Sequence, residues 1–303
     1  PAAVTAEQRD FRFTPAHFRF VQQRIHQLAG IALTDAKQDM VYSRLIRRIR
    51  ARKLDGFDAY LATVRDEGGD EIEPFINALT TNLTAFFREA HHFDRLKQHL
   101  LRATAPRPLR IWCAAASTGE EPWSLAMAAC EAFDTLQPPV QILATDIDTD
   151  ALAIAAAGQY PLTRLSPLSL DQKRRFFLRG RGAQDGEAKV RPELAARVRF
   201  QPWNLLNAQP GILNPYRVVA EPQLDHFVDE EDPERGWRRE RALAAMKRFA
   251  RLAENMGTGP LTAVATADMD RYRQLRLHVE MHCAAVTSGR LDGGARGDAG
   301  AGA

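Results

Sequence analysis

Cysteine is scarce in this chain, with three residues among 303. Cys113, Cys130 and Cys283 are widely spaced, form no Cys-x-x-Cys pair and have no histidine-rich segment beside them. This pattern argues against a disulfide framework and against a structural zinc site. Cys113 falls in a strand-like pattern and Cys130 in a helix-like one, so we predict buried free thiols, a reducing compartment and no metal.

Long apolar runs are also missing. No segment approaches the roughly 18 apolar residues of a membrane span, and the first residues lack the apolar core of a signal peptide. We therefore expect a cytoplasmic protein without membrane insertion. The formal net charge is +3, so a strongly anionic partner would have to be bound by a local cluster of basic residues. The hydrophobic content of 45% is sufficient for a packed core.

The chain divides into regions with different hydrophobic periods. Residues 14–101 show a helical period with breaks near Thr34, Asp55 and Gly68, which predicts a small helical domain. Beyond residue 108, short apolar runs flank a helical pattern, as is typical of a βαβ unit in an α/β fold. The predicted regions are a helical domain at 1–103, a proline-containing linker at 104–108, an α/β domain at 109–287 whose part from 207 is atypical, and a disordered Gly/Ala-rich tail at 288–303.

The most informative motif is LRIWCAAASTGEEPWSLAMAACEAF at residues 109–133. It predicts a strand, a tight loop and a helix, the arrangement by which α/β folds hold nucleotides. The loop contains one glycine, Gly119, where phosphate-binding loops usually have three, and Glu120 and Glu121 would repel a phosphate at a helix N-terminus. These two acids suit a ligand that carries hydroxyl groups or positive charge.

A third acid, Asp146, stands at the expected end of the second strand. An acidic residue at this point of a doubly wound sheet accepts hydrogen bonds from ribose hydroxyls. A ribose and a cation without phosphate describe S-adenosylmethionine. The alternative is a capped helix, in which Ser117 or Thr118 and one of the two glutamates form a capping box. Asp146 favours the cofactor, because ligand-binding groups converge in the crevice of a βαβ unit.

Three longer stretches resemble the chemotaxis receptor methyltransferases of the CheR family. The first is TTNLTAFFREAHHF, the second comprises the two neighbouring motifs AAASTGEEPWS and ATDIDTDAL, and the third is GQYPLTRLSPLSLDQKRRFFLRG. The resemblance covers about residues 18–206. It implies an N-terminal helical domain followed by a Rossmann-like methyltransferase domain, with a small inserted β-subdomain at about 162–200. It also implies the reaction, the methylation of glutamate side chains on chemoreceptor signalling helices. S-adenosylmethionine would be the cofactor and S-adenosylhomocysteine the product.

The resemblance also assigns residues to the cofactor site. Arg88 falls on the position closest to the reacting methyl group and is the predicted catalytic residue. Glu121 matches the acid that meets the methionine end of the cofactor, and Asp146 matches the ribose-binding acid. The complete predicted cofactor-binding set is Asn82, Thr84, Arg88, Glu121, Asp146, Asn204 and Leu205, the last two beside the adenine.

The implied chemistry needs little acid–base machinery. A glutamate carboxylate is already ionised at neutral pH and can attack a sulfonium methyl group in line. The protein must desolvate and align it, and Arg88 could orient it through charge-assisted hydrogen bonds. A capped helix with a phenylalanine core would also explain the segment around Arg88. We expect Phe86 and Phe87 to be core residues and the polar residues of that segment to serve the cofactor.

Two surfaces are predicted to meet a receptor. A basic helical face opposite the apolar residues of segment 39–53 fits an acidic receptor helix, although nucleic acid or solvent would also explain such a face. A glycine-rich turn falls where some family members capture a receptor's C-terminal peptide by strand addition, and a plain hairpin is the alternative. The predicted receptor-binding residues are Arg44, Arg47, Arg48, Arg50, Gly180, Gly182 and Gly186. The expected partners are chemoreceptors and not nucleic acid, and we expect a monomer.

After Leu206 the sequence departs from the family. The family continues with a strand and a loop that carry an Arg-Asn cofactor pair and an active-site tyrosine, whereas residues 207–280 offer a single weak strand and two tyrosines, Tyr216 and Tyr272. An altered reading frame, a fusion or a diverged end would each explain this. Two functional classes therefore remain open, an active protein-glutamate O-methyltransferase and a receptor-docking module that binds the cofactor with little turnover. A third and weaker hypothesis is a methyltransferase that acts on RNA or on a small molecule.

Overall fold

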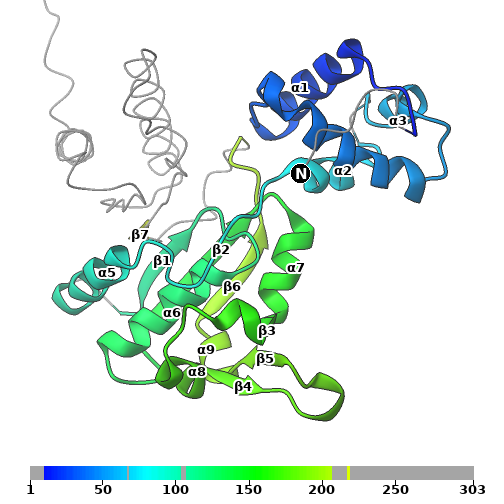
Figure 1. The fold of residues 1–303 in the computed structure, drawn as a ribbon. Coiled ribbons are helices and arrows are strands. Elements are labelled where there is room, and N and C mark those ends of the chain that lie inside the picture. The colour runs from blue at the N-terminus through cyan, green and yellow to red at the C-terminus, as the bar shows by residue number, and fades with distance from the viewer. Residues whose placement is uncertain (1–9, 67, 104–106, 207–216, 219–303) are drawn as a thin grey trace, which may run out of the picture. The chain divides into compact units, whose positions relative to one another are not determined.

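The computed structural model describes residues 10–66, 68–103, 107–206 and 217–218 (Figure 1). The predicted tail at 288–303, most of the atypical segment at 207–287, Cys283 and part of the predicted linker lie outside these residues. The described chain forms two compact units. One contains residues up to 88, 114–127 and 143–206, and the other contains 89–113, 128–142 and 217–218.

The N-terminal part of the first unit is helical, as the sequence predicts. Its helices are α1 (Pro15–Ala29), the short 3₁₀ helix η2 (Asp35–Lys37), α2 (Gln38–Ala51), α3 (Phe57–Thr63) and α4 (Ile72–Leu79). The Thr14 side chain caps α1 by accepting the backbone N–H of His17, and Gly30 ends this helix with a φ of 70°. The chain therefore breaks its helices close to the predicted positions.

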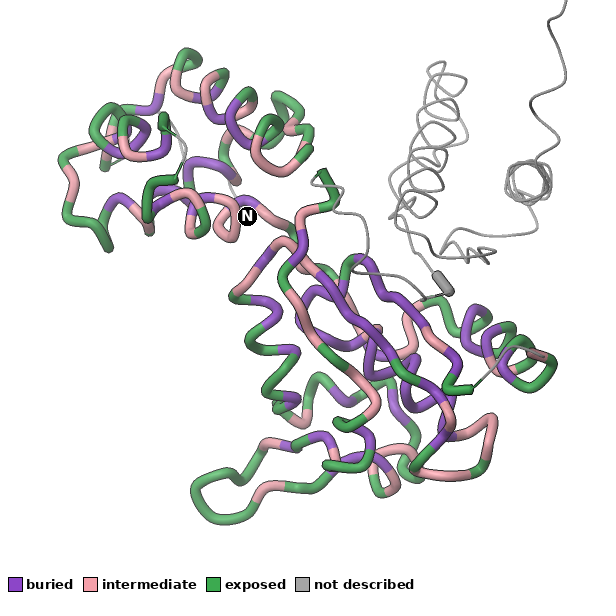
Figure 2. Tube along the Cα trace, turned by 180° about the vertical axis from the view of Figure 1, so that it is seen from behind, coloured by how far each residue is buried: buried purple, intermediate pink, exposed green. Residues whose placement is uncertain are grey.

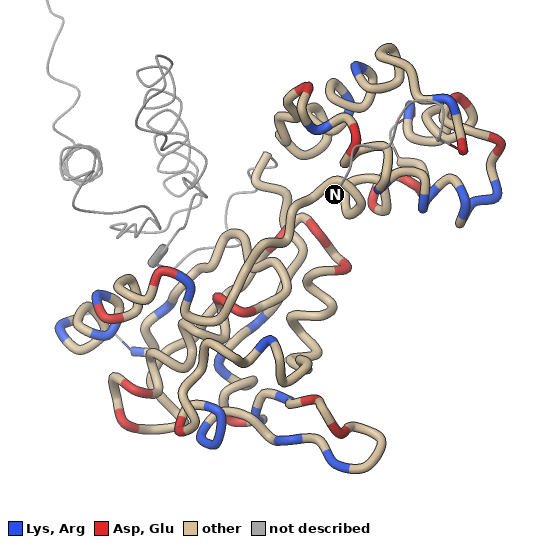
Figure 3. The backbone as a smooth tube through the Cα atoms, viewed as in Figure 1, with Lys and Arg blue, Asp and Glu red and all other residues tan. Residues whose placement is uncertain are grey.

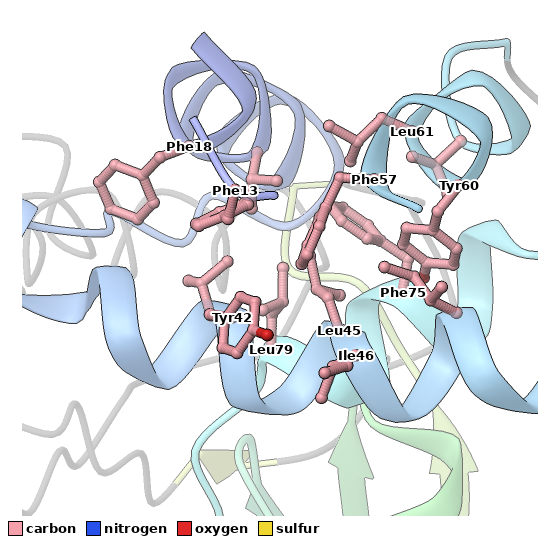
Figure 4. Close-up of a cluster of buried hydrophobic side chains, with 14 of the residues drawn as sticks. Phe13, Phe18, Tyr42, Leu45, Ile46, Phe57, Tyr60, Leu61, Phe75 and Leu79 are labelled. Atoms are coloured by element: carbon pink, nitrogen blue, oxygen red, sulfur yellow. The ribbon is translucent and has the colours of Figure 1, made fainter. Parts of the chain in front are cut away.

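An aromatic and aliphatic cluster holds these helices together (Figure 4). Val41, Leu45 and Ile49 of α2 are 0% exposed, which confirms the predicted apolar face of this helix. Phe13 and Phe57 pack against them with ring centroids 4.4 Å apart. Full burial of such side chains contributes about 1.5–3 kcal/mol each, so this cluster is the main source of stability for the helical part.

The larger sheet has the strand order β6-β2-β1-β7. Its strands and adjoining helices are β1 (Leu109–Cys113), α6 (Glu120–Ala132), β2 (Val140–Asp146), α7 (Thr149–Ala157), β6 (Val198–Pro202) and β7 (Arg217–Val218), with α5 (His91–Arg102) before β1. Most residues of β1 and β2 are buried (Figure 2), as expected for central strands of a Rossmann-like sheet. Cys113 and Cys130 are buried free thiols, as predicted.

The strand β7 corresponds to the weak strand that the sequence suggests beyond residue 206. It pairs in parallel with β1, with Ile111 opposite Arg217 and Trp112 opposite Val218. β7 therefore supplies a short partner strand on the side of β1 that β2 does not occupy.

A second, smaller sheet follows α7 and has the strand order β3-β5-β4. It contains β3 (Gln159–Pro161), η3 (Leu162–Leu165), α8 (Leu170–Phe176), β4 (Phe177–Arg179), η4 (Gly182–Gln184), β5 (Glu187–Val190) and then α9 (Pro192–Ala195). Both strand pairs are antiparallel. The sequence did not predict the three-residue strand β3, and Val198–Pro202, which it placed in the inserted subdomain, joins the larger sheet instead.

None of the helices in the described part of the chain combines the length and the hydropathy that crossing a membrane requires.

Candidate functional site

The loop that follows β1 is held against the end of β2. The backbone N–H of Ala116 donates to the carbonyl of Thr145 at 2.9 Å, and the N–H of Ser117 donates to the Asp146 carboxylate at 2.7 Å. Ser117 has a φ of 49°, in the left-handed region that residues other than glycine seldom adopt. The strained backbone turns the Ser117 N–H toward Asp146, so this residue fixes the shape of the loop.

Gly119 serves the packing of this loop. Its φ is 98°, and a Cβ atom at this position would lie 2.6 Å from the Tyr160 hydroxyl and 2.8 Å from the Cα of Ala155. Any larger residue would therefore push away the start of the small sheet or helix α7. The structure gives the single glycine of the motif a packing role, close to the helix whose first turn carries Glu120 and Glu121.

Asp146 is the last residue of β2, and hydrogen bonds from the backbone hold its carboxylate in place. One oxygen accepts the N–H of Ser117 at 2.7 Å, and the other accepts the N–H of Asp148 at 2.9 Å. Burial raises the pKa of this carboxyl group, and the two backbone N–H groups oppose the rise. A carboxylate has about four acceptor sites, so each oxygen keeps capacity for a further donor such as a hydroxyl group.

Asn82 connects the loop to the start of α7. Its amide nitrogen donates to the Asp148 carboxylate at 2.7 Å, and its amide oxygen accepts the Ser117 hydroxyl at 2.8 Å. Asp148 caps α7 by accepting the N–H of Ala151 at 2.9 Å. Asn82, Ser117, Asp146 and Asp148 thus form one polar cluster at the carboxyl end of β2.

Arg88 and Glu121 belong to two segments that meet at the start of α6. The backbone N–H of Phe87 donates to the Ser124 hydroxyl at 2.9 Å, and Ser124 donates in turn to the carbonyl of Glu120 at 2.6 Å. Arg88 donates to the carbonyl of Leu83 at 3.2 Å and is half-buried, as is Glu121. The backbone beside Arg88 is therefore fixed to the first turn of α6, which also carries Glu121.

The remaining residues of this segment differ in burial. Phe86 is buried, as predicted, whereas Phe87 is half-buried and has a φ of 50°. The prediction that both phenylalanines are core residues is therefore wrong for Phe87, because the turn that places its N–H on Ser124 keeps its ring partly outside. Thr84 is half-buried in the same turn-rich segment.

Asn204 and Leu205 come shortly after β6, and the residue before them, Trp203, is hydrogen-bonded to the end of β2. The N–H of Trp203 donates to the carbonyl of Asp146 at 2.8 Å. The Asn204 amide donates to the carbonyl of Leu28 in α1 at 2.7 Å and accepts the N–H of Leu206 at 3.0 Å. The structure thus brings the predicted adenine-binding pair beside the acid that ends β2, and gives the Asn204 amide two intramolecular partners.

Sequence reasoning missed several members of this site. Ser117 and Asp148 were quoted in the motifs without a predicted contact to Asp146 or Asn82. The repeated acids of ATDIDTD are a recognisable signal, because an Asp three residues before a helical N–H is a common cap. Nothing in the sequence shows which side chain Asn82 meets, since its partners lie 35 and 66 residues away.

The predicted receptor-binding arginines of α2 have unequal environments. Arg48 forms two hydrogen bonds to the fully buried Glu71, at 2.8 and 2.9 Å, and Arg44 donates to the carbonyls of Ala78 and Thr80. Arg47 and Arg50 are exposed, and Arg50 pairs with Asp10. Arg44 and Arg48 thus have structural roles, and Arg47 is the most suitable residue for testing a docking face.

The three predicted glycines surround the end of the β4–β5 hairpin. Gly182 and Gly186 have φ values of 60° and 87°, with open space around them. A Cβ atom on Gly180 would lie 1.9 Å from the carbonyl oxygen of Gln184. All three glycines are required by the backbone of the hairpin itself, and β4 is an end strand of its sheet.

The residues present fit S-adenosylmethionine. The polar groups at the end of β2 are the carboxylates of Asp146 and Asp148 and the amide of Asn82, and α6 begins with two glutamates. Such groups accept hydrogen bonds from ribose hydroxyls and attract an ammonium or sulfonium group, and they disfavour a phosphate. The half-buried and partly satisfied carboxylate of Asp146 retains the acceptor capacity that a diol requires.

Comparison with known proteins agrees with this chemistry. A family model described as CheR methyltransferase, SAM binding domain, matches residues 82–239, and the model for the CheR methyltransferase all-alpha domain matches residues 16–80. The first match continues beyond Leu206, so the similarity extends further than the motifs indicated.

The matches to curated relatives cover most of the length of each relative. Chemotaxis protein methyltransferase 2 of Pseudomonas aeruginosa is 48% identical over 216 residues, which is 70% of this chain and 75% of the relative. The chemotaxis protein methyltransferases of Salmonella typhimurium and Escherichia coli are 47% and 46% identical over 205 residues, or 67% of this chain and 70% and 71% of theirs. The chain therefore belongs to the CheR family of S-adenosylmethionine-dependent methyltransferases.

Proposed function

We propose that this protein transfers the methyl group of S-adenosylmethionine to glutamate side chains of chemotaxis receptors. The relatives are named chemotaxis protein methyltransferases, and both of their family domains match this chain. The observation that carries the proposal is the Asp146 carboxylate, fixed at the carboxyl end of β2 by two backbone N–H groups. A cofactor with a ribose and a cationic centre is the ligand that this end of the sheet suits.

The proposed roles of the other residues follow from their chemistry. The cofactor supplies an activated methyl group on a sulfonium, so the acceptor needs only to be an aligned nucleophile. Glu121 would offer negative charge to the methionine end, and Asn204 and Leu205 would lie beside the adenine. The second amide hydrogen of Asn82 is available in addition to the one given to Asp148, and Thr84 adds a hydroxyl group.

Arg88 is the proposed catalytic residue. Its guanidinium has five N–H donors, and the bond to the Leu83 carbonyl uses one of them. We propose that it orients the incoming glutamate carboxylate through charge-assisted hydrogen bonds without a locked ion pair, which would reduce the nucleophilicity of the carboxylate. No proton has to be removed from the acceptor, since a glutamate is ionised at neutral pH.

Two surfaces are proposed for receptor contact. Positive residues follow the second half of α2 (Figure 3), where Arg47 and Arg50 are exposed. The end strand β4 could pair with an extended receptor peptide, and Leu178 on it is 44% exposed. The first surface suits an acidic receptor helix and the second suits a C-terminal peptide.

The alternative of a docking module without turnover is not favoured. The model for the SAM binding domain of the CheR methyltransferases matches through residue 239, and the relatives with 46–48% identity carry the name of methyltransferases. Tyr216 and Tyr272, the two tyrosines after Leu206, lie outside the described residues.

Two measurements test the proposed function. Titration calorimetry with S-adenosylhomocysteine tests the site, and transfer of labelled methyl groups to receptor-containing membranes tests the reaction. We expect binding by the wild type and by the exposed-site control Asp171→Asn, and weakened binding by Asp146→Asn. Base-labile label on the receptor indicates a glutamate ester. Cofactor binding without any label on the receptor would reject the proposed reaction while keeping the cofactor site.

A further inference from the structure

The small sheet makes direct polar contacts with the cofactor loop. The Tyr160 hydroxyl of β3 donates to the backbone carbonyl of Thr118 at 2.7 Å. Arg164, in the 3₁₀ turn after β3, donates to the Thr118 hydroxyl at 3.2 Å and lies 2.7 Å from a carboxylate oxygen of Glu120. This last contact is an ion pair by distance, with the N–H directed off the line of a hydrogen bond. Thr118 and Glu120 are thus held by the first strand of the small sheet and the turn that follows it.

The two adjacent glutamates of the motif therefore have different environments. Glu120 is 0% exposed, and its other carboxylate oxygen accepts the Thr118 hydroxyl at 2.6 Å. Glu121, the next residue, points about 100° away around the helix and is half-buried. A buried carboxylate needs a charged partner, and Arg164 supplies it from the small sheet. Glu120 thus anchors the first turn of α6, the turn that also carries Glu121.

Tyr160 connects the same sheet to the second cofactor segment. It is 1% exposed, and burial, together with the nearby charge of Glu120, raises the pKa of its hydroxyl, which therefore remains a donor at physiological pH. The ring of Phe86 packs edge-on against Tyr160 with a centroid distance of 5.2 Å and against Phe177 of β4 at 5.7 Å. Phe86 lies in the segment that carries Asn82, Thr84 and Arg88.

We infer that Tyr160 and Arg164 are positioning residues of the cofactor site, which they serve by fixing Thr118 and Glu120 so that Glu121 is aligned. This inference rests on the proposed function of that site. The small sheet then has a role besides any receptor contact, because its first strand and the following turn complete the support of the cofactor loop. Pre-organisation of this kind stabilises the bound state, since the loop does not have to be ordered when the ligand arrives.

Substitution of the two residues tests the inference through S-adenosylhomocysteine binding to the full chain. Arg164→Met keeps the aliphatic stem and removes the charge, and Tyr160→Phe keeps the ring that packs on Phe86. The matched control is Arg179→Met, which removes an arginine of the same sheet whose pairing with Asp185, at 3.8 Å, is exposed and distant from the loop in sequence. Thermal unfolding of every variant separates a loss of fold from a loss of alignment.

We expect Arg164→Met to weaken S-adenosylhomocysteine binding about tenfold at temperatures well below its unfolding transition, a usual size for coupling between a site and its support. Tyr160→Phe should weaken it about threefold, the scale of one neutral hydrogen bond. Arg164→Lys should restore part of the affinity, and Arg179→Met should match the wild type. A merely structural role would lower the unfolding temperature and leave the affinity of the folded protein unchanged.

The outcomes separate this inference from the proposed function. If the wild type fails to bind S-adenosylhomocysteine, the proposed site and this inference both fail. Wild-type binding with unchanged affinity in folded Arg164→Met and Tyr160→Phe overturns the inference alone. If Arg164→Met does not fold, the decision rests on Tyr160→Phe and on Arg164→Met combined with Glu120→Gln, which removes both charges together.

Discussion

Asp146, a proposed cofactor-binding residue, has a raised pKa with a measurable consequence. Burial raises its pKa above the ordinary value for an aspartate, although two backbone N–H groups partly oppose the rise. Protonation removes a charged acceptor from the position where ribose hydroxyls would bind. The affinity for S-adenosylhomocysteine should therefore decrease with falling pH, beginning at a higher pH than an exposed aspartate would give.

Calorimetry at a series of pH values from neutral to mildly acidic measures this effect. Asp146→Asn should bind more weakly, by about 1–3 kcal/mol, and with a flatter pH profile, because the amide cannot ionise. The Asp171→Asn control should keep the wild-type profile. A variant at Asp146 with the same pH dependence as the wild type would assign the titration to another group.

His92 is a second residue whose burial has a measurable consequence. It is 8% exposed, and its Nε2 has no hydrogen-bond partner among the described residues. Burial, followed by the charges of His91 and Arg95, lowers its pKa from 6.5 to about 4. The unfolded chain therefore takes up a proton before the folded chain does, and the stability associated with neutral His92 is lost as pH falls between these two values.

The expected loss is about 1–3 kcal/mol, given 1.36 kcal/mol per pKa unit and incomplete burial. Urea unfolding at about pH 7.5 and pH 4.5 measures most of this change, because at the lower pH His92 is protonated in the unfolded chain and still largely neutral in the folded one. His92→Leu should reduce the pH dependence, whereas His99→Leu, on the exposed side of the same helix, should not. Equal pH dependence in His92→Leu and the wild type would contradict the role given to this side chain.

At the scale of the element, α2 combines a packing helix with a buried ion pair. Glu71 is 0% exposed and is bound by Arg48 through two hydrogen bonds and by the Tyr60 hydroxyl at 3.0 Å. Arg48→Met should destabilise the protein by about 2–4 kcal/mol, because it leaves a buried carboxylate with the weaker contact to Arg52 at 3.6 Å. Chemical denaturation measures this change.

Two comparisons separate charge loss from packing loss at this pair. Arg48→Met with Glu71→Gln should recover part of the lost stability, since the buried charge is then gone. Arg47→Met, on the exposed face, should change the free energy of unfolding by about 0.5 kcal/mol or less. Equal destabilisation by Arg47→Met and Arg48→Met would show that the ion pair has no special role.

The sequence predicts the elements that have a strong period and misses those defined by long-range contacts. The strand that ends at Asp146 and the apolar face of α2 follow from local patterns alone. The strand β3 has three residues, of which one is proline, and such a strand is too short to show a period of two. The basic pattern of α2 gives no sign that Arg48 binds Glu71, since 23 residues separate the two.

The chemistry of the candidate site is likewise predictable where it depends on local sequence and not where it depends on contacts between distant residues. The acids after β1 and at the end of β2 indicate the class of ligand, because residue type and strand position together limit the choice. The division of roles between Glu120 and Glu121 requires the structure, since Arg164 reaches Glu120 from a different sheet. The roles of Arg88, Asn204 and Leu205 stay predictions that binding measurements must test.

At the scale of the whole molecule, the last segment of the chain has a composition unlike the rest. Residues 288–303 are rich in glycine and alanine and cannot bury an apolar core. A chain that ends at Thr287 should keep the wild-type affinity for S-adenosylhomocysteine and the wild-type rate of methyl transfer. Calorimetry and labelled transfer measure both, and a loss of either would give the tail a function that its composition does not indicate.

Receptor docking is also a property of the whole molecule, because the net charge of +3 is too small to attract an acidic partner from a distance. Attraction would have to come from a local cluster, and the exposed arginines of α2 are the cluster that we propose (Figure 3). Methyl transfer to receptor membranes should therefore decrease as salt rises from about 50 to 300 mM, a range in which the Debye length becomes shorter than 10 Å. Binding of S-adenosylhomocysteine should change much less.

Arg47→Ala provides the matched test, since this residue is exposed and its loss should not disturb Glu71 or the cofactor loop. The variant should methylate receptor membranes about threefold more slowly at low salt, the scale of one partly screened charge, and should respond less steeply to salt. Its affinity for S-adenosylhomocysteine should equal that of the wild type. An identical rate and salt response in Arg47→Ala and the wild type would exclude this face of α2 from docking, and the end strand β4 would then be the surface to test.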